Sequence, residues 1–332
     1  MTPRTAAALR PWLLFGLLSL VWGSSYFWIK VGVTEGLLPF TLVTVRLSIA
    51  ALGLALLMAL THGRLPHDRA TLAKLAFLGL INVALPFGLI TWAEQYVGSA
   101  LASILSSLVP LFAIVFAALA LSDEPATLNR LGGLAIGFVG AILLLGRNLA
   151  PAPGTAGDMQ LPGDLALVLA AASYAASGVF IRRYLSGRKL IDDPLTGPRT
   201  LRPVEIALPQ NVAALVVVAV LALLRERVPG GGLLLPPSTL AWVAVIWLGL
   251  FGSALAYLLY FRLLAAWGVT RTTLVTYVMP IVGIALGVFI LHEAVDIQVL
   301  AGAALVIAGI VLVNAPIGQR RIFGRTAAVV PD

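Results

Sequence analysis

Residues 99–121 read SALASILSSLVPLFAIVFAALAL, a stretch of chain without a single charged side chain. An α-helix needs roughly 20 mostly apolar residues to cross the hydrocarbon core of a bilayer, and this stretch is long enough. A surface helix of a soluble protein would carry a charged face instead. The stretch therefore predicts a transmembrane helix, in which four serines lead to Pro110.

The composition of the whole chain extends this interpretation. Only 11% of the 332 residues are charged and 60% are hydrophobic, whereas soluble domains carry roughly 25% charged residues. The apolar runs are continuous and do not alternate, which favours helices over the strands of a membrane β-barrel. We therefore predict an all-α polytopic membrane protein with ten transmembrane helices. The ten windows are 12–31, 40–60, 72–92, 99–121, 131–146, 165–184, 204–224, 240–260, 272–291 and 299–315.

The basic residues indicate how the helices are oriented. Arg10 precedes the first apolar run, as in a secretory signal peptide, but the run continues to Val31, so we predict a permanent helix. With a cytoplasmic N-terminus, most of the 22 Lys and Arg residues fall on the cytoplasmic side, as the positive-inside rule requires. The exceptions are Lys30, Arg147, Arg225 and Arg227, with Arg46 inside the second helix. Both termini are therefore predicted to be cytoplasmic.

An internal repeat divides the chain into two halves. The sequence VPLF at 109–112 matches MPIV at 279–282, an offset of 170 residues. The first helix has a counterpart at 174–182, and the polar insertion at 187–203, which we expect to be a cytoplasmic loop, accounts for its shorter offset. Further pairs at or near the same offset are Leu78 with Leu248, Gly79 with Gly249, Phe87 with Tyr257, Gly98 with Gly268, and Glu124 with Glu293.

Each half contains five helices, and an odd number inverts the second half relative to the first. Inverted repeats are typical of transporters, whose substrate site lies near the midplane between the halves. We predict the first repeat at 12–147, the second at 164–315, and a basic cytoplasmic tail at 316–332.

These features resemble the drug/metabolite transporter superfamily, specifically its ten-helix members built from two EamA-type repeats. The residues that carry the resemblance are Trp22, Gly23, Ser24 and Ser25, the matched Pro110 and Pro280, the acidic turns at 122–125 and 292–294, and the glycine-spaced helices that follow them. The resemblance implies a multi-pass secondary transporter of the inner (plasma) membrane that exports amino acids or similar metabolites by alternating access. Related branches move sugars, nucleotide sugars or drugs.

Polar side chains within the predicted spans outline the expected substrate cavity, because such groups usually face a bundle interior. Hydroxyls, one amide and aromatic faces with little charge fit a zwitterion or another small amphiphilic solute. The same serines and threonines also allow close helix packing, and that alternative stays open. The predicted substrate-binding residues are Trp22, Ser25, Asn82, Ser103, Ser107, Tyr174, Ser177, Tyr257, Thr273 and Tyr277. Pro110 and Pro280 are predicted to kink their helices as hinges, or as static bends.

Few charged residues accompany these polar groups. Arg46 is the one basic residue that we predict inside a membrane span. We expect it either to bind a substrate carboxylate or to have a structural role. Glu94, just past the third helix, either titrates with a proton or is a solvated loop carboxylate. Asp123 and Glu124 precede Pro125 in a helix-start pattern, and Glu293 occupies the matching turn, so we expect structural roles for all three acids.

Other classes of function lack their signatures. The three histidines have no companions for a metal site, no phosphate-binding loop is present, and we expect no cofactor and no nucleic-acid partner. A lipid-modifying enzyme would need clustered acids or histidines at one membrane face, and the sequence has no such cluster. A receptor or scaffold would not need an inverted repeat. A transporter of drug cations would be expected to have an acidic residue within the spans, and a transporter of nucleotide sugars several basic residues. We expect a functional monomer surrounded by membrane lipid, and not an enzyme.

Overall fold

The computed structural model describes residues 3–66, 68–120, 126–146, 159–193, 197–226, 235–272, 274–314 and 321–323. Within them the helices are α1 (Pro3–Thr34), α2 (Pro39–Leu60), α3 (Arg69–Gly79), η1 (Leu80–Ala84), α4 (Leu85–Ala93), α5 (Ser99–Ser106), α6 (Val109–Ala120), α7 (Leu128–Gly146), α8 (Gln160–Tyr184), α9 (Pro203–Arg225), α10 (Thr239–Gly249), η3 (Leu250–Leu255), α11 (Ala256–Thr272), α12 (Val275–Phe289) and α13 (Ile297–Asn314). The prediction of an all-α polytopic membrane protein is confirmed.

Within the described residues, eight helical stretches are long and apolar enough to cross a membrane, and the apolar helices α12 and α13 are shorter. Three of the eight combine successive elements: α3, η1 and α4 form one, α5 and α6 a second, and α10, η3 and most of α11 a third. The polar insertion contains a hairpin of β2 (Lys189–Asp193) and β3 (Gly197–Thr200). β1 (Ala126–Thr127) pairs with β4 (Arg321–Phe323).

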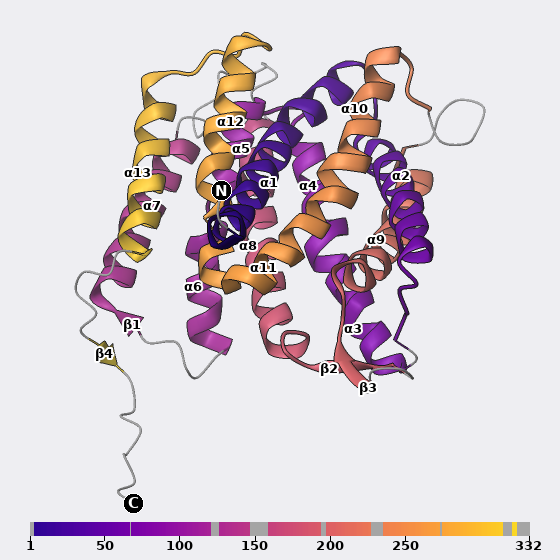
Figure 1. Cartoon of the computed structure of the whole chain (residues 1–332). Helices are drawn as coiled ribbons and strands as arrows, with labels where there is room; N and C mark the ends of the chain where they lie inside the picture. The colour runs from indigo at the N-terminus through magenta and orange to yellow at the C-terminus, as the bar shows by residue number, and fades with distance from the viewer. Residues whose placement is uncertain are drawn as a thin grey trace, which may run out of the picture.

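The helices form a bundle around two hydrophobic clusters (Figure 1). α7 and α13 lie side by side at one edge, and α2 packs against α9 at the other. α1 lies between them and packs against α12, α10 and α11. Trp22, Tyr174 and Tyr260 contact both clusters, so these three aromatic side chains lie where the two parts of the interior meet.

Two π-helical turns interrupt the helices, and they occupy matching places in the sequence. η1 begins at Leu80 and η3 at Leu250, 170 residues later. A glycine precedes each turn and lies against a neighbouring helix. A Cβ on Gly249 would lie 2.8 Å from the carbonyl oxygen of Arg46, and one on Gly79 would overlap the carbonyl oxygen of Gln210. Arg46 and Gln210 are therefore spatial counterparts.

The two matched prolines have different local effects. Pro110 follows a break between α5 and α6, where Ser107 and Leu111 make i→i−3 backbone bonds. The proline has no N–H to offer the carbonyl four residues earlier. Pro280, in contrast, lies inside the continuous helix α12.

The contact between α7 and α13 gives a test of this packing. A Cβ on Gly309 would lie 2.5 Å from both the carbonyl oxygen of Gly133 and the amide nitrogen of Gly137, and backbone atoms cannot yield as a side chain can. Gly309→Val should therefore cost about 1–3 kcal/mol of stability, seen as a lower melting temperature in detergent. Gly132→Ala is the control, because its Cβ would meet only the Leu312 side chain, at 3.7 Å. Equal melting temperatures for the two variants would contradict the close helix contact.

Candidate functional site

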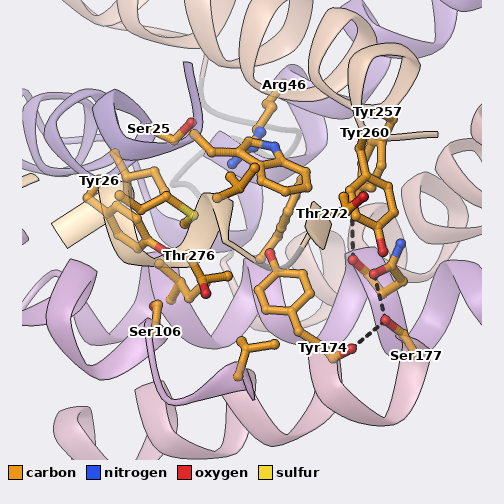
Figure 2. A pocket seen from close by; sticks show the side chains of 18 residues that line it. Ser25, Tyr26, Arg46, Ser106, Tyr174, Ser177, Tyr257, Tyr260, Thr272 and Thr276 are labelled. Carbon is orange, nitrogen blue, oxygen red and sulfur yellow. Dashed lines mark hydrogen bonds between the residues drawn. The ribbon is translucent and has the colours of Figure 1, made fainter. Parts of the chain in front are cut away.

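A cavity of about 120 Å³ lies in the middle of the bundle (Figure 2). The 18 residues that line it come from α1, α2, η1, α4, α5, α6, α8, α11 and α12. We call it the central cavity. Its lining is Trp22, Ser25, Tyr26, Ile29, Arg46, Asn82, Phe87, Ile90, Ser106, Val109, Tyr174, Ser177, Tyr257, Tyr260, Thr272, Val275, Thr276 and Met279.

Arg46 supplies the positive charge of the central cavity. Its side chain is only 2% exposed, and the guanidinium lies 3.8 Å from the centroid of the Phe87 ring. Nε donates to Ser253 Oγ at 2.8 Å and Nη2 to the carbonyl of Gly252 at 3.4 Å. Among the described residues, no carboxylate lies within ion-pair distance of Arg46 and no acceptor is bound to Nη1. A buried cation without a counter-ion is costly and is suited to binding an anionic group.

The π-turn η1 supplies a second set of polar groups to the cavity. The N–H of Leu85 bonds to the carbonyl of Leu80 and bypasses that of Ile81. The next carbonyl, that of Asn82, has Pro86 four residues later, which has no N–H. Side chains from other helices fill both vacancies: Ser173 Oγ donates to the Ile81 carbonyl at 2.6 Å, and the Tyr257 hydroxyl donates to the Asn82 carbonyl at 2.9 Å.

The Asn82 side chain extends this network across the bundle. Ser177 Oγ donates to Asn82 Oδ1 at 2.8 Å, and Asn82 Nδ2 donates to Gln210 Oε1 at 3.2 Å. The Asn82 amide is therefore oriented by partners from α8 and α9. This network and Arg46 give the central cavity one neutral polar pole and one cationic pole.

Aromatic rings also line the cavity. The ring of Trp22 lies 5.4 Å from that of Tyr260 and 6.2 Å from that of Tyr257, between centroids. Figure 2 shows the hydroxyl of Tyr174 pointing into the cavity from the side opposite Arg46. Such surfaces accept an apolar or aromatic group, while the poles accept its polar ends.

The structure brings most of the predicted residues together. Trp22, Ser25, Asn82, Tyr174, Ser177, Tyr257 and Arg46 all line the central cavity. Three others point elsewhere. Ser103 packs against Gly283 of α12, Ser107 Oγ donates to the carbonyl of Ile104, and the Tyr277 hydroxyl donates to the carbonyl of Ile310 on α13. Thr273 lies outside the described residues.

Several lining residues were not among those predicted, although four of them had a usable signal. Tyr26 follows Trp22 by four residues and Tyr260 follows Tyr257 by three, spacings that put each pair on one helix face. Ser106 and Thr276 belong to the polar stripes of their helices. Nothing in the sequence indicated that Val109 and Met279 line the cavity, because apolar residues are equally expected in a packed core.

Glu94 is not the solvated loop carboxylate that the sequence allowed. The residue is 0% exposed, and its carboxylate has no hydrogen-bond partner among the described residues. A position just after a helix suggested exposure to water, but the turn that carries Glu94 is buried by other segments. Glu293 has the structural role expected of it, but for a distant helix: it accepts the N–H groups of Ser99 and Ala100 at the start of α5. Asp123 and Glu124 lie outside the described residues.

An all-helical membrane protein with a polar cavity at the centre of its bundle has the architecture of a transporter. The chain belongs to the EamA-like transporter family, which matches residues 10–146 and 161–315. This confirms the resemblance to the drug/metabolite transporter superfamily and the prediction of a multi-pass inner-membrane transporter with a small-molecule substrate.

Two relatives and one solved structure illustrate the family. The chain is 30% identical over 279 residues to the uncharacterised inner membrane transporter YedA of Escherichia coli, covering 82% of this chain and 81% of the relative. It is 28% identical over 306 residues to the probable terminal-alkyne amino-acid exporter of Streptantibioticus cattleyicolor, covering 92% of each. A crystal structure at 18% identity has the same fold, with a TM-score of 0.62 over 92% of this chain and 97% of that one.

The hydrogen bond from Tyr257 to the Asn82 carbonyl can be tested by removing one hydroxyl. Tyr257→Phe leaves a buried carbonyl without that donor, which costs about 1–3 kcal/mol, and we expect a lower melting temperature in detergent. Tyr260→Phe is the matched control, because no hydrogen bond is seen for its hydroxyl within the described part of the chain. A Tyr257→Phe protein as stable as the Tyr260→Phe protein would show that the carbonyl does not depend on this donor.

Proposed function

We propose that this protein exports small amphiphilic carboxylates, most of all amino acids, by alternating access through the central cavity. The observation that carries the proposal is the Arg46 guanidinium, which faces the cavity without a carboxylate partner among the described residues. A substrate carboxylate would supply the missing counter-ion in a charge-assisted hydrogen bond. The aromatic rings would hold the substrate's apolar part.

The proposed architecture has ten spans in two inverted repeats, at 12–147 and 164–315, with a basic tail at 316–332 and both termini cytoplasmic. The matched π-turns and the matched glycine contacts at Gly79 and Gly249 support the repeat. The distribution of basic residues supports the orientation. An inverted repeat within one chain can enclose a complete cavity, and we propose a functional monomer.

The central cavity favours this substrate class over the alternatives. At about 120 Å³ it is smaller than the roughly 300–1,000 Å³ of sites for drug-sized ligands, which disfavours a nucleotide sugar. A drug cation would be repelled by Arg46, and no acidic residue belongs to the lining. A neutral sugar would leave the Arg46 charge unpaired. The amino-acid exporter among the relatives agrees with the proposal. The polar and aromatic residues of the lining are of the kinds that bind a small solute.

Flux in proteoliposomes tests the role of Arg46. We expect saturable transport of an aromatic amino acid and weaker transport of its amide, which lacks the carboxylate. Arg46→Gln should raise the KM for the acid about 10–100-fold, because a hydrogen bond to a charged group is worth about 1.5–3 kcal/mol. The variant should also lose the preference for the acid over the amide, a change that a purely structural role would not produce.

Arg262→Gln is the control, since this arginine is exposed and lies outside the cavity. It should keep both the flux and the preference. Transport of a sugar or a cationic dye alone, in protein that is folded, would overturn the amino-acid proposal. Absence of flux for every solute in a panel of amino acids, sugars and dyes would overturn the transport proposal itself.

A further inference from the structure

Glu94 is a buried acid that the central cavity does not use. It follows the last residue of α4, beyond the span Arg69–Ala93. Its side chain is 0% exposed, and neither carboxylate oxygen has a hydrogen-bond partner among the described residues. A carboxylate in such a place is expensive to keep ionised, and it neutralises by holding a proton.

The neighbouring charged groups do not pair with the Glu94 carboxylate. Lys30 of α1 is the nearest cation, but its ammonium donates to the backbone carbonyls of Glu94 and Val97, at 2.7 and 3.0 Å. No ion pair joins Lys30 to the Glu94 carboxylate among the described residues. The Glu293 carboxylate, from the turn after α12, is engaged by the N-terminus of α5.

Three further titratable groups face this region from other elements. Tyr26 of α1 and Arg46 of α2 lie within electrostatic range of Glu94. Asp164 is buried near the start of α8, whose Gly163 lies against Ala93 and Val97. Burial raises the pKa of the Glu94 carboxyl well above its usual range, while the Lys30 ammonium opposes the rise and the Glu293 carboxylate adds to it.

Glu94 lies between the central cavity and a second one. One helical turn before it, Ile90 lines the central cavity, as does Tyr26, one turn before Lys30. On the other side, Lys30 and Val97 line a cavity of about 270 Å³ that also includes Gln160 and Glu293. We call this the outer cavity, because the proposed orientation places it on the outer side of the membrane.

A proton suits this position better than a metal cation. The Lys30 ammonium occupies the backbone carbonyls that would otherwise ligate a metal, and it would repel one. A metal cation also needs several oxygen ligands, whereas a proton needs only the carboxylate.

We propose that Glu94 is a proton-binding site, loaded when the helices close around the outer cavity and unloaded when they open it to water. The proton comes from solution and adds to one carboxylate oxygen. This inference rests on the proposed alternating access. It gives the transport cycle a dependence on pH.

The sign of that dependence follows from linkage. A carboxyl in water has a pKa of about 4.3, and in the closed structure Glu94 keeps its proton to a higher pH. Acid therefore favours the closed conformation. Between the two pKa values each pH unit changes the closed-to-open ratio by up to about tenfold, and outside them the ratio is constant.

Cysteine labelling measures this equilibrium without any substrate. The chain has no cysteine, so Val97→Cys, buried beside Glu94 in the outer cavity, reports its opening. Ala294→Cys, exposed at the same cavity, corrects for the pH dependence of thiol chemistry. With a membrane-impermeant maleimide and the purified full chain, corrected labelling of Val97→Cys should fall as the pH is lowered.

Three further variants separate Glu94 from other groups. Glu94→Gln imitates the protonated acid and should keep labelling low at every pH. Glu35→Gln should keep the parent's pH response, because Glu35 lies at the same end and already accepts a hydrogen bond from Ser238. Lys30→Gln should move the midpoint to higher pH, since it removes the charge that opposes protonation. This variant still tests the site if Glu94→Gln does not fold.

Corrected labelling that does not change with pH would overturn the proton site, and so would a pH response that persists in Glu94→Gln. Because labelling requires no solute, these outcomes are independent of the flux assay. A pH response without amino-acid flux would overturn the proposed substrate and keep the proton site. Amino-acid flux without a pH response of the labelling would overturn the proton site and keep the proposed substrate.

Discussion

Every backbone carbonyl buried in a membrane needs a hydrogen-bond donor, and the centre of this protein is organised by that requirement. The π-turns η1 and η3 each leave carbonyls without helical partners. The donors come from the opposite half of the chain: Tyr257 reaches Asn82, and Arg46 reaches Gly252. The same irregularity therefore joins the halves and brings polar side chains to the central cavity, as π-turns do at many functional sites.

The two halves use this scaffold differently, and the difference defines the site. Asn82 and Gly252 are matched positions, and so are Arg46 and Gln210, which lie against the matched glycines Gly249 and Gly79. In one half the matched side chain is a guanidinium, and in the other it is an amide bonded to Asn82. Different side chains at these matched positions thus give the cavity one charged pole, which can orient a substrate that has distinct ends.

The helices could be predicted from the sequence because continuous apolar runs are visible without any structure. The cavity could be predicted in outline, since polar groups in lipid turn inward. The sequence could not predict which of these inward-facing groups contact one another. Ser103 shares a stripe with Ser106, yet the helix break before Pro110 and the close approach of Gly283 place it in a packed contact. The burial of Glu94 could not be predicted, because burial of a turn depends on neighbouring segments, here α1 and α8, that the local sequence does not describe.

Two other acids at this end of the bundle have backbone donors that Glu94 lacks. Glu226 accepts the N–H groups of Phe40 and Thr41 at the start of α2, at 2.6 and 2.7 Å, and Glu293 does the same at α5. For each of these carboxylates, two backbone donors and a helix dipole replace the hydrogen bonds that water would make. Glu94, at the same end of the bundle, has neither. Glu94 lacks the donors that Glu226 and Glu293 have, and a proton is the partner that lowers the cost of burying its carboxyl group.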